Sequence, residues 1–297
     1  MSDLENYIND YKHYLLSKGL SKATYDAYIS DLDRFMQYCT SVGVKNPNQI
    51  DLTGFNNYIN QLKIKNLSNS SINRNISSAK SFSRFLFKEG IIKTDVLSEY
   101  KPIFQNSELP QILDRNEVVK LLDAPKGNSV KSKRDKVLLE LLYATGMKVS
   151  ELIELTTGDI NLRFNIVKIN SEKHERTVPI YPEAARHLSE YIKIYRPAIS
   201  ANNTELLFTN LNGNRLSRQG VWKIIKQYAG KIGIEKTITP HTLRHSFAVH
   251  LLENGADIND IKEMMGHLDI SSTMFYSNLL KNKFSRGYAI YHPLAKK

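Results

Sequence analysis

The stretch that decides the interpretation of this sequence is TPHTLRHSF, at residues 239–247. Pro240 suits the first turn of a helix, because its missing N–H and fixed φ cost nothing there. His241 and Arg244 are three residues apart, which places them on one helix face, one turn from each other. His245 follows one position later and is turned away from Arg244. The apolar residues that would bury this helix are Ala248, Leu251 and Leu252.

A second informative stretch lies further along the chain, MGHLDISSTMFY at residues 265–276. Gly266 can end a helix that begins at Asp257, because glycine readily adopts the left-handed conformation that follows many last turns. His267 would then lie on a turn and could point into a cleft. Tyr276 follows nine residues later, just after a short stretch that serine can cap.

The residues before this region predict further helices and one small sheet. Helical periodicity begins near Arg115 and again over residues 133–145, and Gly146 ends the second of these helices. Over residues 159–180, β-branched and aliphatic residues partly alternate with polar ones and are interrupted by two polar breaks. This pattern predicts a three-stranded antiparallel sheet. After Pro182 the pattern is helical again, nearly to the end of the chain.

The first hundred residues predict helices only. Apolar residues recur at three- and four-residue spacing over residues 4–15, which is the period of one helix face. Ser21 and Asp51 can cap the second and third helices, and a fourth runs from about Ser70 to Glu89.

Two prolines separate the two patterns. Pro102 and Pro110 bracket polar residues, and proline discourages helix in the residue before it. We therefore expect a helical domain at 1–100, a linker at 101–110 and a second domain at 111–297. The predicted fold is mainly α with a small antiparallel β-sheet, in two domains.

The outer face of the helix predicted near residues 70–89 has an unusual composition. Short polar side chains with cations between them can lie close to a phosphate backbone and donate hydrogen bonds to it. A solvated helix face has the same composition, so both interpretations stay open. The residues of this face are Asn69, Ser70, Ser71, Asn73, Arg74, Asn75, Ser77, Ser78, Lys80, Ser81, Ser83 and Arg84.

The charge of the chain favours a polyanionic partner. The formal net charge is +11, from 41 Lys+Arg and 30 Asp+Glu. Residues 111–297 hold 28 of the basic and 19 of the acidic residues, and therefore +9 of this charge. A basic excess attracts nucleic acid more often than any other polyanion. The apolar fraction of 41% is enough to build hydrophobic cores, so wholesale disorder is not expected.

The sequence argues against several other classes of protein. The single cysteine, Cys39, allows no internal disulfide and fits a reducing compartment. No stretch approaches the roughly 18 apolar residues that cross a membrane, and the acidic, polar start is unlike a secretory signal. We therefore expect a cytoplasmic protein. Four histidines lie between residues 241 and 267, but no HExxH or similar ligand spacing accompanies them, so no metal site is expected.

Together the motifs resemble the tyrosine recombinase (phage integrase) family, in particular its two-domain Xer-like members. The resemblance spans nearly the whole chain, and the ending HPLA at 292–295 is also similar to Xer-like members. It implies a helical N-terminal core-binding domain and an α-rich catalytic domain that together recombine DNA at specific sites. The motifs that carry it are ATGMKVSEL at 144–152, His241-x-x-Arg244, Gly266-His267 and Tyr276.

The resemblance implies that Tyr276 is the nucleophile, forming a 3′-phosphotyrosine and freeing a 5′-hydroxyl. In-line attack on phosphate also needs cations on the non-bridging oxygens and an acid for the leaving oxygen. Arg244 offers planar, bidentate donors, and His241 and His267 can donate to the same phosphate or assist proton transfer from Tyr276. The covalent link retains the bond energy, so no ATP is needed. The resemblance implies no metal and no other cofactor.

The chain departs from the family at Lys148, where the ATGxR segment of the family has arginine. Lysine keeps the charge but loses the bidentate fork. Either Lys148 is a natural variant with weaker cleavage or it was introduced to slow cleavage. In both cases we expect Lys148 to face the scissile phosphate.

A second departure concerns the lysine that serves the family as general acid on a β-hairpin, typically within GKGxKxR-V-P. The matching stretch here is NSEKHERTVP, at residues 170–179. Counting back from Pro179 puts Ser171 at the lysine position, and Lys173 is the nearest candidate in the turn. We expect Lys173 to be the acid, the alternative being a solvated turn lysine.

The resemblance also implies an assembly on DNA. Four subunits, identical or shared with a second recombinase, would hold two DNA sites through a Holliday junction. The C-terminal segment 278–297 would dock on a neighbouring protomer, or else pack on its own domain. An activating partner protein is a further expectation that the resemblance leaves open. The cations expected to contact DNA are Arg74, Lys80, Arg84, Arg215 and Arg218.

Two other functions compete with recombination. A type IB topoisomerase-like relaxase shares the phosphotyrosine chemistry but acts as a monomer on any sequence, and residues 144–152 and 292–295 favour the recombinase. A DNA-binding protein that has lost catalysis is the second alternative, because of Lys148, and it would leave no covalent DNA adduct. Within recombination, the motifs fit chromosome dimer resolution as well as mobile-element integration or excision.

Overall fold

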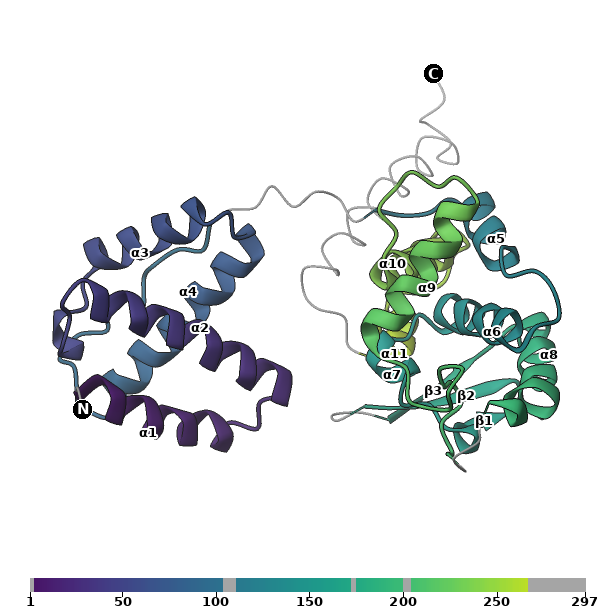
Figure 1. The fold of residues 1–297 in the computed structure, drawn as a ribbon, viewed down its shortest axis with the longest axis horizontal. Helices are drawn as coiled ribbons and strands as arrows, with labels where there is room; N and C mark the ends of the chain where they lie inside the picture. The colour runs from purple at the N-terminus through teal and green to yellow at the C-terminus, as the bar shows by residue number, and fades with distance from the viewer. Residues whose placement is uncertain (1–2, 104–110, 172–174, 200–203, 267–297) are drawn as a thin grey trace, which may run out of the picture. The chain divides into compact units, whose positions relative to one another are not determined.

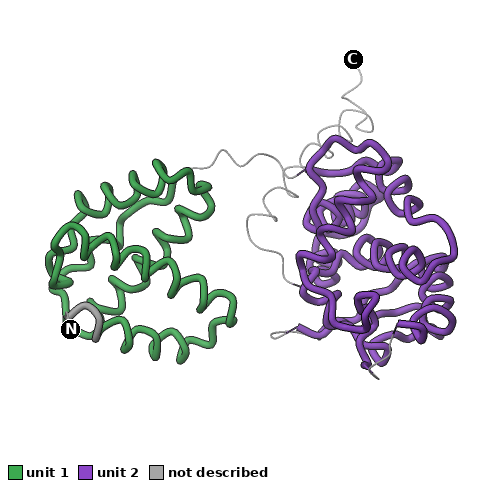
Figure 2. Tube along the Cα trace, in the orientation of Figure 1, with its two compact units in different colours: residues 1–108 green, residues 109–297 purple. Residues whose placement is uncertain are grey.

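A computed structural model describes residues 3–103, 111–171, 175–199 and 204–266 (Figure 1). Side chains are described from residue 7 onward. The chain divides into two compact units, Met1–Glu108 and Leu109–Lys297 (Figure 2). The division between the units falls inside residues 101–110, the stretch expected to be a linker.

The described part of the first unit is helical, as its apolar periodicity predicts. Two of the predicted caps are confirmed: the Ser21 hydroxyl accepts from the Thr24 N–H at 3.2 Å, and the Asp51 carboxylate accepts from the Gly54 N–H at 2.7 Å. The helices are α1 (Asp3–Ser17), α2 (Lys22–Ser41), α3 (Leu52–Ile64) and α4 (Asn69–Lys88), with a 3₁₀ turn at Pro47–Gln49.

Aromatic side chains from all four helices form the core of this unit. Tyr11 of α1 meets Phe82 of α4 edge-on at 5.2 Å between ring centroids, and Phe35 of α2 meets Phe55 of α3 edge-on at 5.4 Å. Edge-to-face pairs add to the hydrophobic gain from burial. Each helix is therefore held to the bundle by at least one large buried ring.

A buried carboxylate also joins α2 to α4. Asp31 is 1% exposed and accepts hydrogen bonds from Arg74 at 2.6 and 3.1 Å, from Arg34 at 3.1 Å and from Asn75 at 3.1 Å. The Asn75 amide oxygen in turn accepts from the Tyr58 hydroxyl at 2.7 Å. The network satisfies a buried charge, and it leaves the Arg74 side chain 48% exposed.

The polar face expected on the outside of α4 is only partly exposed. The prediction is wrong for three of its residues. Asn75, Ser78 and Ser83 are buried. The Ser78 hydroxyl donates to the Tyr28 carbonyl at 2.8 Å, and Ser83 bonds the Asp95 carboxylate. Short hydroxyl side chains suit these positions because they bind groups of the neighbouring segments where α4 packs closely against them.

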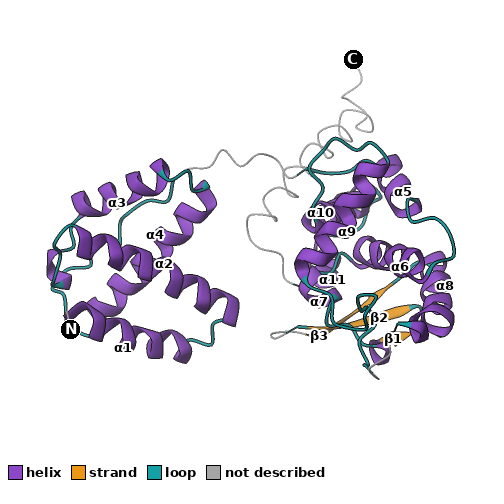
Figure 3. Ribbon diagram, viewed as in Figure 1, coloured by secondary structure: helices purple, strands orange, loops and turns teal. Residues whose placement is uncertain are grey.

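The second unit combines helices with one small sheet, so the predicted mainly α fold is confirmed. Figure 3 shows the strands gathered at one end of the unit, with helices making up the rest. The described α-helices are α5 (Arg115–Asp123), α6 (Val130–Thr145), α7 (Val149–Leu152), α8 (Pro182–Glu190), α9 (Arg218–Lys231), α10 (Pro240–Glu253) and α11 (Ile258–Met265).

The sheet has the predicted antiparallel arrangement. Its strands are β1 (Ile160–Asn161), β2 (Ile166–Asn170) and β3 (Glu175–Pro179), in the order β1-β2-β3. Val167 lies opposite Val178, and both are fully buried. Alternate residues of β2 and β3 thus face the core, as the alternation in the sequence indicates.

The expectation of helix throughout the region after Pro182 is wrong over part of its length. α8 continues into a π-helical turn at Tyr191–Tyr195, and the chain at 204–217 forms turns and isolated bridges instead of a helix. The Asn210 side chain explains the turn, because it accepts from the N–H groups of Asn212 and Asn214, both at 2.9 Å. Such local bonds compete with helix formation.

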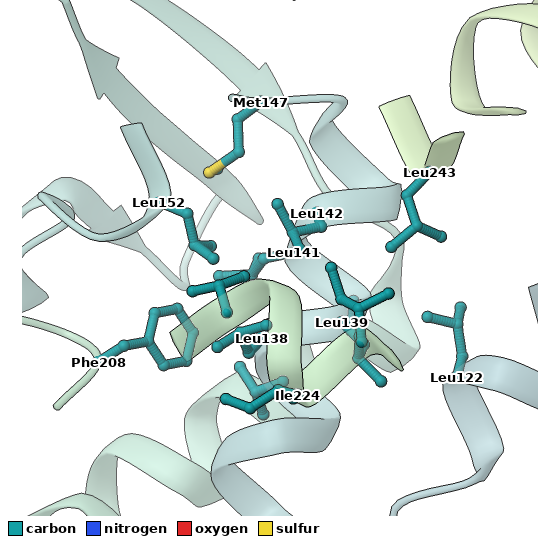
Figure 4. Close-up of a cluster of buried hydrophobic side chains, with 14 of the residues drawn as sticks. Leu122, Leu138, Leu139, Leu141, Leu142, Met147, Leu152, Phe208, Ile224 and Leu243 are labelled. Atoms are coloured by element: carbon teal, nitrogen blue, oxygen red, sulfur yellow. The ribbon is translucent and has the colours of Figure 1, made fainter. Parts of the chain in front are cut away.

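Helix α6 is the centre of the second unit. Figure 4 shows Leu138, Leu139, Leu141 and Leu142 packed among side chains from several other elements, and all four are at most 1% exposed. The helix ends at Gly146, as predicted, with φ +60°. A Cβ atom there would lie 2.4 Å from the Phe247 ring, so glycine lets α10 pack against the end of α6. This contact positions the helix that carries His241 and Arg244.

The Asp31 network gives a first prediction. Substituting Asp31→Asn should lower the free energy of unfolding by about 2 kcal/mol, because charge-assisted hydrogen bonds from two arginines are lost at a buried site. Asp33→Asn, on the exposed side of the same helix, is the matched control and should change stability little. Denaturant unfolding of the full chain measures both, and equal losses would contradict the assigned role of Asp31.

Candidate active site

Arg244 lies buried between the ends of two helices. It belongs to α10 and is 7% exposed. One of its terminal nitrogens donates to the carbonyl oxygen of Gly146, just past α6, and the other donates to that of Met265 at 2.7 Å, the last residue of α11. These bonds fix the plane of the guanidinium. A positive charge is also favourable at the C-terminal end of α11, where carbonyl groups lack partners within the helix.

His241 and Lys148 are exposed beside this buried arginine. His241 lies in the first turn of α10, where Pro240 occupies the first helical position and Thr239 caps the helix. Lys148 directly precedes α7, and its backbone N–H donates to a Glu151 carboxylate oxygen at 2.8 Å. The loop from Gly146 to Lys148 thus places Lys148, the residue that differs from the family motif, next to α10.

The electrostatic coupling of these residues is visible in His241. Although His241 is exposed, partial loss of hydration of the imidazole, together with the nearby charges of Arg244 and Lys148, holds the pKa of His241 below its usual value. The lowered pKa favours the neutral imidazole, the form that can accept a proton. The structure brings together three of the predicted catalytic residues, His241, Arg244 and Lys148.

The sequence analysis missed a buried ion pair beneath this group. Arg176 of β3 donates to both carboxylate oxygens of Glu151, at 3.0 and 2.8 Å, and both side chains are nearly inaccessible. Burial opposes ionisation of Glu151, but the hydrogen bonds from Arg176 and the Lys148 N–H outweigh it and hold the pKa of Glu151 below its usual value. Glu151 lies within the motif at 144–152, and Arg176 lies within the stretch at 170–179. Their positions inside these motifs were the one signal in the sequence that could have pointed to them.

Three predicted catalytic residues lie outside the described residues: His267, Tyr276 and Lys173. Their roles stay predictions, as does the role of segment 278–297. The structure does describe the residue before His267. Gly266 ends α11 with φ +66°, so the predicted end of that helix is confirmed.

The cations expected to contact DNA occupy different environments. Arg74 is paired with Asp31, and the Lys80 ammonium donates to the Tyr100 carbonyl at 3.0 Å. Arg84 is exposed and, with Lys80, lines a groove on the first unit that also includes Lys18, Tyr14 and Ser77.

In the second unit, Arg215 forms an ion pair with Glu154, and both side chains are about half exposed. Arg218 is exposed at the start of α9, next to the Ser217 cap. Neither arginine is buried in the second unit, so both present positive charge at its surface.

The remaining histidines of the 241–267 region do not form a cluster of metal ligands within the described residues, where no group of three or more His, Cys, Asp and Glu could hold an ion. His250 is buried, and its Nδ1 lies 2.9 Å from the Tyr143 hydroxyl. In the parts of the chain that the structure describes, no helix has the length and apolar character needed to cross a membrane.

A helical first unit, and a second unit that carries most of the positive charge and gathers histidine, lysine and arginine at one place, fit a class of enzyme that transfers DNA strands through phosphate chemistry. Comparison with known sequences gives the same answer. The Phage integrase family matches residues 111–283, and the family described as Phage integrase, N-terminal SAM-like domain matches residues 8–90. The chain belongs to the phage integrase family of tyrosine recombinases and is a site-specific recombinase.

Relatives extend this likeness over nearly the full length. The chain is 39% identical to Tyrosine recombinase XerD of Staphylococcus epidermidis over 295 residues, which cover 98% of this chain and 100% of the relative. A solved structure of XerH recombinase bound to palindromic difH substrate matches with a TM-score of 0.76 at 20% identity, covering 90% of this chain and 79% of that one.

A lambda integrase dimer bound to a COC' core site matches with a TM-score of 0.73 at 17% identity, covering 93% and 95% of the two chains. At this identity, as for XerH, the match concerns the fold alone.

The shared environment of His241 and Lys148 gives a second prediction. Substituting Lys148→Gln removes one of the positive charges that oppose protonation of His241, so the pKa of His241 should rise toward its usual value. NMR titration of the imidazole measures this directly. Lys193→Gln, an exposed lysine whose charge does not act on His241, serves as the control. An unchanged titration of His241 in the Lys148 variant would show that its ammonium points elsewhere.

Proposed function

We propose that this recombinase cleaves and rejoins DNA through Tyr276, by way of a 3′-phosphotyrosine intermediate and a Holliday junction. The observation that supports the proposal is that His241 and Lys148 gather around Arg244, which binds the Met265 carbonyl at the end of α11. His267 follows that end directly in the sequence, and Tyr276 follows nine residues later.

Arg244 would stabilise the phosphate as it gains charge. A guanidinium has five N–H donors in a rigid plane. Two of them bind the Gly146 and Met265 carbonyls, which orients the group before DNA arrives. Donors that need no reorganisation at the moment of reaction are worth more than mobile ones.

His241 would assist the loss of the Tyr276 proton. A phenol has a pKa near 10 in water and needs a base or a positive field to ionise near neutrality. Because the lowered pKa of His241 favours the neutral imidazole, His241 would accept a hydrogen bond from the nucleophile. His267 would donate to the same phosphate.

Lys148 would place a point charge where the family has a planar fork. Its ammonium neutralises a phosphate oxygen but cannot bind two oxygens in one plane. We therefore expect cleavage to be slower than in the arginine-containing variant of the same protein. Lys173 would protonate the leaving 5′-oxygen, since an acid is required there and it stands three residues before Arg176 in the hairpin.

The DNA site would be held by cations on both units. Arg74, Lys80 and Arg84 would contact phosphates from the first unit, and Arg215 and Arg218 from the second. The exposure of Arg84 and Arg218, and of about half of the Arg74 and Arg215 side chains, supports these contacts. Phosphate contacts fix the position of a protein on DNA without reading its sequence.

The assembly would be a tetramer on two DNA sites, formed by this chain alone or with a second recombinase, and segment 278–297 would link neighbouring protomers. An activating partner protein would be a further component of this assembly. The tetramer and the partner protein rest on family resemblance, and the DNA site is also supported by matching structures of proteins bound to DNA.

Among the biological roles, we favour chromosome dimer resolution in the cytoplasm. The 39% identity to a protein named XerD extends over 98% of this chain, whereas the lambda integrase match has 17% identity. The alternatives are mobile-element integration or excision, a type IB topoisomerase-like relaxase, and a DNA-binding relative without catalysis.

The test of the proposed nucleophile is covalent capture. Nicked duplexes from the chromosome terminus and from around the gene are incubated with the protein, and adducts are separated on a denaturing gel. Tyr276→Phe should abolish the adduct, because it removes the attacking oxygen. Lys148→Arg should strengthen it, because the bidentate fork is restored.

Other outcomes identify the alternatives. An adduct that appears only with Lys148→Arg would mean a disabled recombinase. Tight DNA binding without an adduct in any variant would favour a DNA-binding protein. Relaxation of plasmids of any sequence by the monomer would favour the topoisomerase.

A further prediction concerns the groove on the first unit. Arg84→Met should flatten the dependence of log K for DNA on log salt concentration by about one unit of slope, as expected for one phosphate contact. Lys65→Met removes a similar charge at the end of α3, outside the residues of the groove, and serves as the control. Fluorescence anisotropy across a salt series measures both slopes, and equal changes would argue against a specific contact by Arg84.

A further inference from the structure

Arg176 occupies a position where three segments of the second unit meet. Its side chain is 3% exposed. From β3 it binds both oxygens of Glu151 on α7, and its Nε donates to the carbonyl oxygen of Met264 on α11 at 2.7 Å. Three of its five donors are therefore used, each on a different acceptor atom, and the guanidinium is fixed in position and plane.

The same guanidinium packs against Gly266. A Cβ atom on Gly266 would lie 2.8 Å from Arg176 Nη1, closer than side chains approach in proteins. Arg176 and Arg244 bind the carbonyls of Met264 and Met265 respectively, so the two last residues of α11 are each held by an arginine. Because His267 is the next residue, this contact fixes the point from which that segment starts.

The partner of Arg176 holds the other side of the active site. Glu151 Oε2 accepts both from Arg176 and from the backbone N–H of Lys148, each at 2.8 Å. One buried ion pair thus connects the backbone of Lys148 with the backbone of residues 264–266. It also ties both to β3, which begins two residues after Lys173.

We infer that Arg176 is a positioning residue that, together with Glu151, sets the Lys148 loop and the backbone of residues 264–266 in one fixed relation. The inference rests on the proposed function, because it concerns the geometry of the cleavage site. A purely structural role is the competing explanation. The two differ in what happens when the pair is replaced by apolar side chains of similar size, since such replacement is often neutral or stabilising for the fold.

The experiment uses the double variant Arg176→Met/Glu151→Met in the full chain. It leaves no unpaired buried charge, so the unfolding midpoint should stay near that of the unsubstituted protein. The contacts to the Met264 carbonyl and to the Lys148 N–H are lost, however. The rate of covalent adduct formation on nicked DNA should therefore fall by about 10- to 100-fold, as expected for a small displacement of reacting groups. Amide hydrogen exchange near residues 264–267 should become faster.

Two glycines provide a matched pair. Gly266 and Gly255 both follow a helix with positive φ, +66° and +98°, but a Cβ on Gly255 meets nothing within 4 Å. Gly255→Ala and Gly266→Ala both place alanine at a positive φ, the first further from the left-handed region than the second, and only the second collides with Arg176. Gly266→Ala should lose adduct formation by about 10-fold or more while Gly255→Ala stays within about twofold. In the double-methionine background, Gly266→Ala should add little.

The inference is overturned if the double variant keeps both the cleavage rate and the exchange pattern of the unsubstituted protein. It is also overturned if the two glycine substitutions have equal effects, or if Gly266→Ala adds its full loss in the double-methionine background. If the unsubstituted chain and Lys148→Arg form no Tyr276-dependent adduct, the proposed function fails instead. The exchange measurement still decides whether Arg176 orders residues 264–267.

Discussion

A guanidinium that is withdrawn from water must have its donors satisfied, and this constraint organises the catalytic unit. Arg244 and Arg176 are both buried, and both find acceptors at the end of α11. Their positive charges meet a helix terminus whose carbonyls lack partners within the helix. The buried arginines therefore hold the last two residues of α11, after which Gly266 ends the helix.

The centre of the unit makes this arrangement rigid. Helix α6 is buried on nearly all sides, and its end at Gly146 lies against the Phe247 ring of α10. Because interiors are packed as densely as organic crystals, a shift of one helix is transmitted to the next. The Gly146 carbonyl is therefore held in place by the packing of α6 against α10, and it fixes the position of the Arg244 guanidinium.

The sequence predicted the helices, their caps at Ser21 and Asp51 and the antiparallel sheet, because each has a local signal. It also predicted that His241, Arg244 and Lys148 share a site, through family resemblance. The Glu151–Arg176 pair could not be predicted, because its members are 25 residues apart and meet only when β3 folds against α7. The prediction that Ser78 and Ser83 lie on the outer face of α4 was wrong for a similar reason. The packing of α4 against neighbouring segments, and not the polarity of the side chain, decides which hydroxyls are buried.

The hydrogen bonds between Asp31 and Arg74 lower the entropic cost of binding a polyanion. A long arginine side chain normally loses rotamer freedom when it engages a partner. Arg74 has lost much of that freedom already, because the buried Asp31 carboxylate holds its Nε and Nη2. The ordering cost is met during folding, so a polyanion that reaches this side chain encounters a cation already oriented. Affinity gained in this way depends on stiffness of the free protein rather than on any additional contact.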